Sequence, residues 1–189
     1  MQILTVPIAL IWILFFAYWL ISALGNRSPF KRRPSRISFL TYSAVPVIVG
    51  VFLAGKFAPW ILVNRFLPDD IFLAIAGLLI TIGGLGFAVW ARRNLGKNWS
   101  GLPAIHENHT ITRTGPYGIV RHPIYTGILV GELGTTLAMG YLSGVLFFFA
   151  ILAVFLVKIR FEETFLLEEF GEEYARYMRE VKALIPFVI

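Results

Sequence analysis

The segment PIYTGILVGELGTTLAMGYLSGVLFFFAILAVFLV, residues 123–157, decides the fold of this chain. Its only charged side chain is Glu132. A single helix of these 35 residues would extend for about 52 Å, whereas the hydrocarbon core of a bilayer is about 30 Å thick. The segment must therefore turn once, and residues 140–144 (GYLSG) supply the turn, because glycine and serine are common turn residues. We predict a tight hairpin of two membrane helices.

Three more uncharged segments precede this hairpin, at residues 3–24, 37–55 and 71–91. Each is close to the roughly 20 apolar residues that a membrane helix needs. The chain is 57% hydrophobic and 15% charged, with a mean hydropathy of +0.73, whereas soluble domains are about 45–50% apolar and about 25% charged. These values exclude a soluble globule and predict an all-α integral membrane protein with five transmembrane helices.

The chain divides into two regions. Residues 1–91 contain the first three transmembrane helices and form a scaffold, with Asp70 expected as the N-cap of the third. Residues 92–189 form the second region, with a long polar loop, the hairpin 123–157 and a C-terminal amphipathic helix from 158 to 179. Gly171 interrupts this last helix, and Pro186 stops any helix near the end of the chain.

The net charge of +6 is concentrated at particular places in the chain. All lysines and arginines except Lys56 and Arg65 follow the first, third or fifth apolar segment: Arg27, Lys31, Arg32, Arg33, Arg36, Arg92, Arg93, Lys97, Arg113, Arg121, Lys158, Arg160, Arg176, Arg179 and Lys182. The positive-inside rule therefore places the N-terminus outside and the C-terminus in the cytoplasm. We expect membrane lipids as partners and no nucleic acid. The first segment carries its charges after the apolar run, which indicates a retained helix rather than a signal peptide.

The chain contains no cysteine, which excludes disulfides, thiolate metal sites and cysteine nucleophiles. All three histidines, His106, His109 and His122, lie in the cytoplasmic segment 92–122, and long irregular segments of this kind usually carry function. His106 and His109 are three residues apart in a proline-flanked loop, but no nearby carboxylate pattern completes a zinc site. We therefore expect no metal.

Glycines recur in the third and fourth apolar segments. Residues 83–86 (GGLG) could suggest a dinucleotide-binding loop, but they lie inside a membrane segment with no preceding strand. Close packing between helices explains them more simply, and the same interpretation applies to Gly127, Gly131 and Gly134.

Glu132 is a carboxylate within a membrane helix, where an ionisable group is costly unless it faces a partner or a cavity. It shares a helix face with Tyr125, Ile128 and Leu129, at spacings of seven, four and three residues. If Tyr125 lines a pocket, Glu132 points toward it from deeper in the membrane. The alternative is a carboxylate near the outer interface, either snorkelling or protonated.

Two polar motifs lie where the hairpin meets the cytoplasmic side. Residues 121–127 (RHPIYTG) place His122 beside a helix N-terminus, whose free N–H groups favour an anionic ligand group. Residues 158–163 (KIRFEE) place Lys158 and Glu162 on one helix face. Because two crossings return the chain to the side it left, the hairpin brings the motifs together. The alternative is an ordinary interfacial belt of cations and tyrosines.

These motifs occur within a longer pattern, composed of residues 95–100 (LGKNWS), His109, Ile111, Gly115, Tyr117, residues 121–127, Glu162, Glu163, Leu166, Phe170, Gly171, Tyr174, Tyr177 and Pro186. In order and spacing this pattern resembles the isoprenylcysteine carboxyl methyltransferase family and its prokaryotic relatives. The resemblance covers about half of the chain. It implies an integral membrane enzyme that uses S-adenosylmethionine without a Rossmann domain, with the cofactor entering from the cytosol and a lipid-like substrate from the bilayer.

The resemblance also implies which residues form the site. The cofactor pocket, formed by the cytoplasmic loop and the C-terminal helix, would use His109, Thr110, Ile111, Thr112, Tyr117, His122, Pro123, Ile124, Tyr125 and Glu162. The family has an arginine one turn before the glutamate, where it orients the substrate carboxylate; this chain has Lys158 there and Arg160 two residues later. Lysine offers a point charge instead of a bidentate fork.

The expected reaction is methylation of the carboxylate of an isoprenylcysteine-like lipid by direct displacement. An ionised carboxylate needs alignment and a dry site but no general base. An amine or thiol acceptor, in a related enzyme acting on a phospholipid or a small thiol, would need a base, and Glu132 and His122 are the candidates. Two further alternatives are an NADPH-dependent enzyme similar to sterol reductases and a non-catalytic membrane binding protein.

Overall fold

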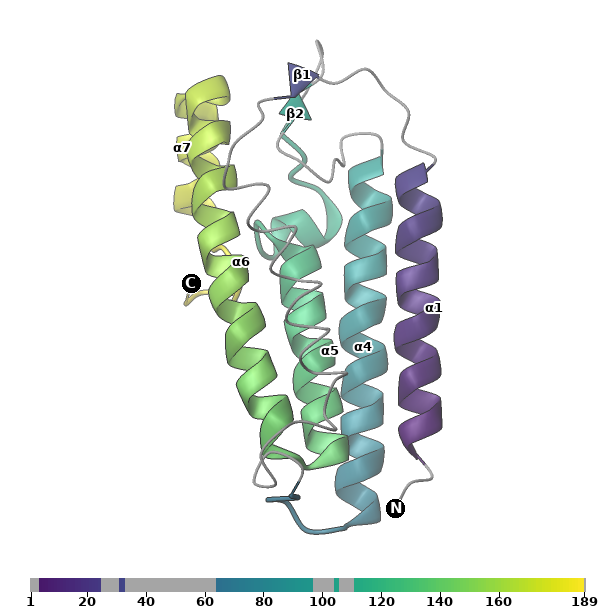
Figure 1. Cartoon of the computed structure of the whole chain (residues 1–189). Coiled ribbons are helices and arrows are strands. Elements are labelled where there is room, and N and C mark those ends of the chain that lie inside the picture. Colours follow the sequence, from purple (N-terminus) through teal and green to yellow (C-terminus); the bar gives the residue numbers. More distant parts are fainter. Residues whose placement is uncertain (1–3, 25–30, 33–63, 97–103, 106–110, 189) are drawn as a thin grey trace.

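The structure is a computed structural model that describes residues 4–24, 31–32, 64–96, 104–105 and 111–188 (Figure 1). Its elements are α1 (Thr5–Leu24), β1 (Lys31–Arg32), α4 (Ile71–Leu95), β2 (Ala104–Ile105), the 3-10 helix η4 (Gly115–Gly118), α5 (Pro123–Met139), α6 (Leu142–Phe170) and α7 (Glu172–Glu180). Strands β1 and β2 pair antiparallel over two residues each, which the sequence analysis does not predict.

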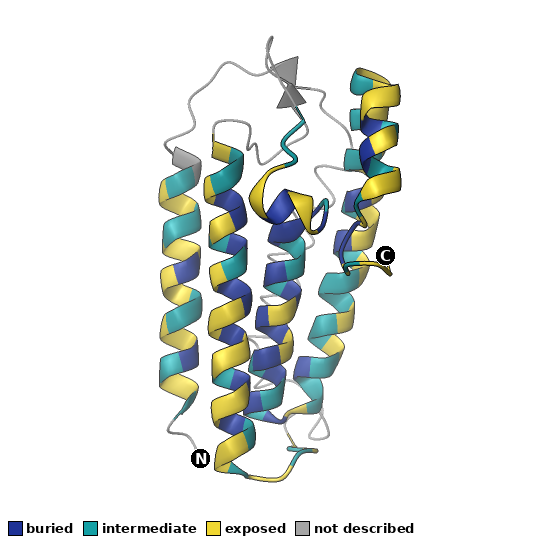
Figure 2. Cartoon of the chain, turned by 180° about the vertical axis from the view of Figure 1, so that it is seen from behind, coloured by how far each residue is buried: buried dark blue, intermediate teal, exposed yellow. Residues whose placement is uncertain are grey.

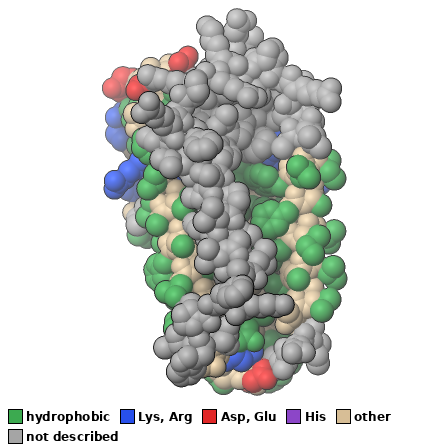
Figure 3. Space-filling model, in the orientation of Figure 1, with side chains coloured by type: hydrophobic (Ala, Val, Ile, Leu, Met, Phe, Trp, Pro, Cys, Tyr) green, Lys and Arg blue, Asp and Glu red, His purple; other side chains and the backbone are tan. Residues whose placement is uncertain are grey.

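The long helices α1, α4, α5 and α6 lie side by side as a bundle (Figure 1). Three of them, α1, α4 and α6, are long and apolar enough to cross a membrane. Exposed residues run along the outer faces of the helices and buried ones face the interior (Figure 2). In Figure 3, charged side chains gather near the two ends of the visible face, with hydrophobic ones between them. The prediction of a helical integral membrane protein is confirmed, while the predicted span 37–55 lies outside the described residues.

Helices α4 and α5 approach so closely that glycine is required at the contact. A Cβ on Gly84 would lie 2.4 Å from the backbone nitrogen of Gly131, and one on Gly134 would lie 2.4 Å from that of Thr81. Such distances leave no room for a side chain and identify the seam predicted from small residues. Gly83 and Gly86 face open space, so Gly84 is the only one of these three glycines at the contact.

The predicted hairpin is confirmed. Helix α5 ends at Met139, and Gly140 adopts a left-handed conformation with φ of 70° that reverses the chain into α6. Gly144 then packs on Thr136, since a Cβ there would lie 2.6 Å from the Thr136 hydroxyl oxygen. Asp70 caps α4 as expected, because its carboxylate accepts hydrogen bonds from two backbone N–H groups of the first turn.

The C-terminal helical region differs from the prediction. Helix α6 continues without a break from the membrane segment to Phe170, so a separate amphipathic helix does not begin at Lys158. No glycine or proline occurs between Lys158 and Gly171, where α6 ends and the short α7 begins. Gly171 is therefore the interruption that was predicted, but it separates α6 from α7.

Contacts between helix termini show which of them lie at the same end of the bundle. The Arg92 guanidinium donates to the Ser22 carbonyl, so α1 and α4 end on the same side. The Thr5 hydroxyl contacts the Met139 sulfur at 3.9 Å, so α1 begins where α5 ends. Because α5 and α6 form a hairpin, the start of α5 and the end of α6 lie at the end where α1 and α4 finish. We call this the site end.

Candidate functional site

The site end is completed by the last part of the chain. Val120 and Lys182 form a parallel β-bridge. The Arg121 and His122 backbone N–H groups donate to the carbonyls of Lys182 and Ala183, at 2.8 and 3.0 Å. We call residues 181–184 the C-terminal strap. It runs along the entry to α5 and brings α7 against the same entry.

Glu162, on α6, faces the start of α5. The Tyr125 hydroxyl donates a 2.7 Å hydrogen bond to Glu162 Oε1. Lys158 Nζ lies 3.8 Å from the same oxygen, one turn earlier on α6, and His122 Nδ1 lies 3.6 Å from Glu162 Oε2. The carboxylate is thus held between the two ends of the hairpin.

Glu163 is the second carboxylate of the site and binds a different pair of groups. Its Oε1 atom accepts from Arg121 Nε at 2.8 Å and lies 2.7 Å from a terminal guanidinium nitrogen of the same arginine. His122 Nε2 lies 3.1 Å from that oxygen. His122 therefore lies between the two carboxylates, hydrogen-bonded to Glu163 and 3.6 Å from Glu162. We call Arg121, His122, Lys158, Glu162 and Glu163 the ion cluster.

Aromatic rings continue from the ion cluster toward the interior of the bundle. The His122 and Tyr125 rings are nearly parallel, at 5° and 5.6 Å between centroids. Tyr125 then stacks on Phe155 of α6 at 4.5 Å. Lys158 Nζ lies 5.2 Å from the centroid of the Tyr125 ring, a cation–π contact. The site therefore combines carboxylates with ring faces, both of which bind cationic groups.

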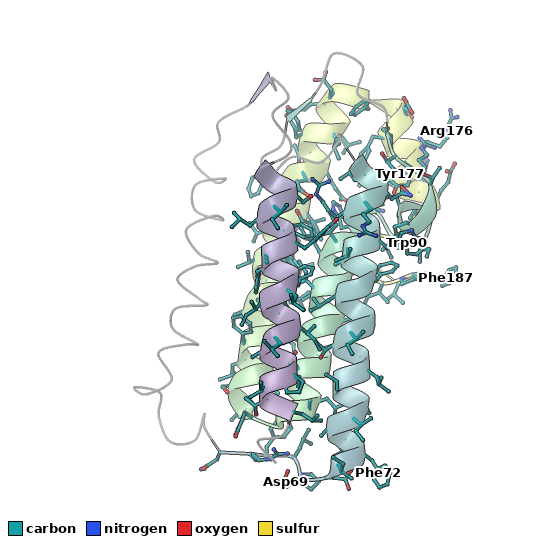
Figure 4. All side chains as sticks on the ribbon, turned by 90° about the vertical axis from the view of Figure 1, so that its right-hand side faces the viewer. Asp69, Phe72, Trp90, Arg176, Tyr177 and Phe187 are labelled. Atoms are coloured by element: carbon teal, nitrogen blue, oxygen red, sulfur yellow. The ribbon has the colours of Figure 1, made fainter. Side chains whose placement is uncertain are left out.

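Tyr117 and Tyr177 attach the loop before α5 to α7. The Tyr177 hydroxyl donates a 2.6 Å hydrogen bond to the Tyr117 carbonyl. Burial raises the pKa of Tyr177 to about 12 and also raises the pKa of Tyr117. Figure 4 shows Tyr177 on the inner side of this helix, whereas Arg176 points away from the bundle. The Tyr177 hydroxyl therefore keeps its proton and this hydrogen bond well into the alkaline range.

The residues predicted to bind the cofactor fall into three groups by their position in the structure. His122 and Tyr125 join Glu162 in direct contact, and Pro123 and Ile124 are buried beside them, with Ile124 packed in one cluster with Tyr117. Ile111 and Thr112 are half-buried ahead of η4. His109 and Thr110 lie outside the described residues, as does His106.

The three residues predicted to be catalytic are not together. Lys158 belongs to the ion cluster, whereas the Arg160 side chain is exposed. Glu132 is only 4% exposed and accepts a 3.4 Å hydrogen bond from the Thr136 hydroxyl within α5. It follows His122 by ten residues, which is about 15 Å along a helix. Glu132 therefore lies in the bundle interior, well below the ion cluster.

The roles of Arg121 and Glu163 are not predicted by any sequence motif considered above. The available signal is adjacency, because each is next to a residue that is predicted to bind the cofactor. The strap could not be found in this way, since its polar contacts with the entry to α5 use its backbone groups. Within the part of the chain that the structure describes, no group of three or more metal-binding side chains occurs.

The similarity to known proteins includes the region that carries the ion cluster. A family model described as phospholipid methyltransferase matches residues 72–173, which contain the whole ion cluster. The chain is 32% identical over 120 residues to a probable protein-S-isoprenylcysteine O-methyltransferase of Oryza sativa subsp. indica, covering 62% of this chain and 63% of the relative. It is 33% identical over 117 residues to the protein-S-isoprenylcysteine O-methyltransferase of Saccharomyces cerevisiae, covering 60% and 49%. This chain spans less than two thirds of the length of each.

A solved structure is also similar. It is the structure of the eukaryotic intramembrane Ras methyltransferase, isoprenylcysteine carboxyl methyltransferase. The likeness has a TM-score of 0.59 at 26% sequence identity and covers 82% of this chain and 55% of that one. The likeness therefore extends beyond the segment that the family model matches.

Proposed function

The chain belongs to the phospholipid methyltransferase family, and on that premise we propose that it is a membrane methyltransferase that uses S-adenosylmethionine to methylate the carboxylate of an isoprenylcysteine-like lipid. The predicted resemblance to the isoprenylcysteine carboxyl methyltransferase family is confirmed by the relatives and by the solved structure. The observation that supports the proposal best is the placement of Glu162 between Tyr125, Lys158 and His122 at the site end.

The residues of the site fit this cofactor. When bound, S-adenosylmethionine supplies a methyl group on a positively charged sulfur. Glu162 and the stacked rings of Tyr125 and Phe155 provide the carboxylate and the ring faces that a cation prefers. The backbone N–H groups at the start of α5, beside His122, suit the carboxylate of an amino acid. We assign the nucleoside to Tyr117 and to the segment of His109, Thr110, Ile111 and Thr112.

The acceptor is assigned to the inner side of the same site. Lys158 orients the substrate carboxylate. Arg160, which is exposed two residues later, lies on a different face of α6. Tyr125 and Phe155 exclude water from that side, which strips hydration from the carboxylate and raises its reactivity. Glu132, deeper in the bundle, is assigned to the path of the lipid substrate. Because no proton has to be removed, none of these residues acts as a base.

We also propose a membrane topology for the chain. Helix α1 ends at the site end, whereas Asn64 and Arg65 lie at the opposite end, where Arg65 pairs with Tyr141. We propose that the apolar segment 37–55, which lies between them in the sequence, is the fifth span. The N-terminus lies outside, and residues 92–189 form the catalytic region facing the cytoplasm.

A phospholipid amine is the second candidate acceptor, because the matching family model is described by phospholipid methylation. That reaction would need a base, and His122 lies closer to the proposed methyl donor than Glu132.

To identify the acceptor, purified protein in nanodiscs is incubated with radiolabelled S-adenosylmethionine and one of two acceptors. These are a farnesylated cysteine analogue and a phosphatidylethanolamine. The proposal expects a base-labile methyl ester on the cysteine analogue. A base-stable methyl group on the phospholipid alone would support the second candidate and contradict the first.

A further inference from the structure

Arg121 connects three separate parts of the site. Its side chain is 8% exposed and binds Glu163 through two nitrogens. It also donates to the carbonyls of Met178, at 3.2 Å, and Val181. These carbonyls are at the end of α7 and the start of the strap, where no helical N–H is available to them. One guanidinium therefore holds α6, α7 and the strap together.

Three further hydrogen bonds join the strap to the entry of α5, and none of them uses the Arg121 side chain. They come from backbone N–H groups of Arg121 and His122 and from the Thr126 hydroxyl, which donates to the Leu184 carbonyl at 2.8 Å. Ala183 and Leu184 are buried in the core cluster that contains Phe155. The strap is thus both a wall of the site and part of the core beneath it.

The same guanidinium fixes the partner of His122. Glu163 Oε1 is the atom that accepts from Arg121 and also lies 3.1 Å from His122 Nε2. The His122 ring stacks on Tyr125, whose hydroxyl binds Glu162. A contact chain therefore runs from Arg121 through Glu163 and His122 to Tyr125 and Glu162.

We propose that Arg121 is a positioning residue, which orients His122 through Glu163 and holds the strap against the entry to α5. It touches neither cofactor nor substrate in the proposed function, on which this inference rests. A planar guanidinium with several fixed donors can bind the carboxylate and the two carbonyls at once. A lysine ammonium could satisfy only part of this set. The exchange rates and the cofactor affinity of Arg121→Lys should therefore lie between those of the native protein and those of Arg121→Gln.

Arg113 offers a matched control. It also binds α7, through the Glu173 carbonyl at 2.8 Å and the Glu180 carboxylate at 3.7 Å, and its guanidinium lies 5.3 Å from the Tyr177 ring. Among the residues that the structure describes, Arg113 contacts neither Glu163 nor His122. Loss of Arg113 therefore loosens α7 without breaking the contact chain.

The experiment uses full-length protein in nanodiscs, as the native form, Arg121→Gln, Arg121→Lys and Arg113→Gln. Hydrogen exchange is measured without cofactor for peptides containing residues 121–122, S-adenosylmethionine affinity by calorimetry, and the melting temperature by fluorescence. We expect the amides of residues 121–122 to exchange faster in Arg121→Gln than in the native protein. We also expect its affinity for S-adenosylmethionine to fall by about tenfold or more, the size expected for lost charged hydrogen bonds. Arg121→Lys should fall between, and Arg113→Gln should match the native protein in both readouts at a similar melting temperature.

Native exchange in Arg121→Gln would overturn the inference. An equal loss of affinity in Arg113→Gln would also overturn it, because the effect would then follow the attachment of α7 in general. If the native protein does not bind S-adenosylmethionine, the proposed function fails, and the exchange rates still decide whether Arg121 holds the strap.

Discussion

Tyr125 and Glu162 are joined by a 2.7 Å hydrogen bond although 37 residues separate them in the chain. The hairpin explains this contact, because Tyr125 lies just after the start of α5 and Glu162 lies near the end of α6. The bond connects the two polar motifs across the hairpin. It also fixes the orientation of a carboxylate that the proposed function needs.

Replacing Tyr125 with phenylalanine tests this bond while the ring remains. A hydrogen bond to a charged group contributes about 1.5–3 kcal/mol, so we expect S-adenosylmethionine affinity to fall by about tenfold. Calorimetry on the purified protein measures the change. Tyr141→Phe, at the far end of the bundle, is the control and should bind as the native protein does.

The glycine seam predicts opposite outcomes for adjacent substitutions in α4. Gly84→Ala places a methyl group against the backbone of α5 and should destabilise the protein by about 1–3 kcal/mol or more. Gly83→Ala meets open space and should be neutral or stabilising by up to about 1 kcal/mol. Melting temperatures in one detergent compare the two. Equal destabilisation by both variants would contradict the observed packing of α4 on α5.

The absence of cysteine allows the topology to be tested with single introduced thiols. Asp69→Cys lies before α4 and Glu180→Cys ends α7, and both side chains are more than half exposed. In intact cells a membrane-impermeant maleimide should label the first and not the second. The reverse pattern would mean that the site end faces outside.

Tyr177 predicts how stability depends on alkaline pH. Its pKa is about 12 in the folded protein, above the ordinary value of 10.0, because burial disfavours the phenolate. Stability should therefore be constant below about pH 10 and fall as pH rises toward 12, since the unfolded chain loses the proton first. Melting temperatures across this range should fall less steeply in Tyr177→Phe. That variant should also melt lower at neutral pH, because the Tyr117 carbonyl loses its donor.

The membrane helices were predictable because their signal is local. The length of residues 123–157 required a turn, and Gly140 provides it with a left-handed backbone. The extent of α6 was predicted wrongly, because the change from apolar to charged residues at Lys158 was interpreted as the start of a new helix. Where a helix leaves the apolar segment, its composition changes but its backbone hydrogen bonds continue. In α6 they end at Gly171.

The ion cluster was predictable only in part. Spacing placed His122, Tyr125 and Glu162 at the same membrane surface, and the structure brings them into contact. The strap contacts the entry to α5 through backbone groups, which every residue possesses, so no residue type marks them. Glu132 shares a face with Tyr125 in sequence, but two turns of helix separate them.

The most direct test of the account is calorimetric titration of the purified protein with S-adenosylmethionine, for the native chain, Glu162→Gln and Glu169→Gln. Glu169 is exposed on the same helix and serves as the matched control. We expect the native protein and Glu169→Gln to bind S-adenosylmethionine equally, and Glu162→Gln to bind it about tenfold or more weakly, because a carboxylate that faces a cation is lost. A folded native protein that binds no S-adenosylmethionine, or a Glu162→Gln variant that binds as the native protein does, would contradict the proposed function.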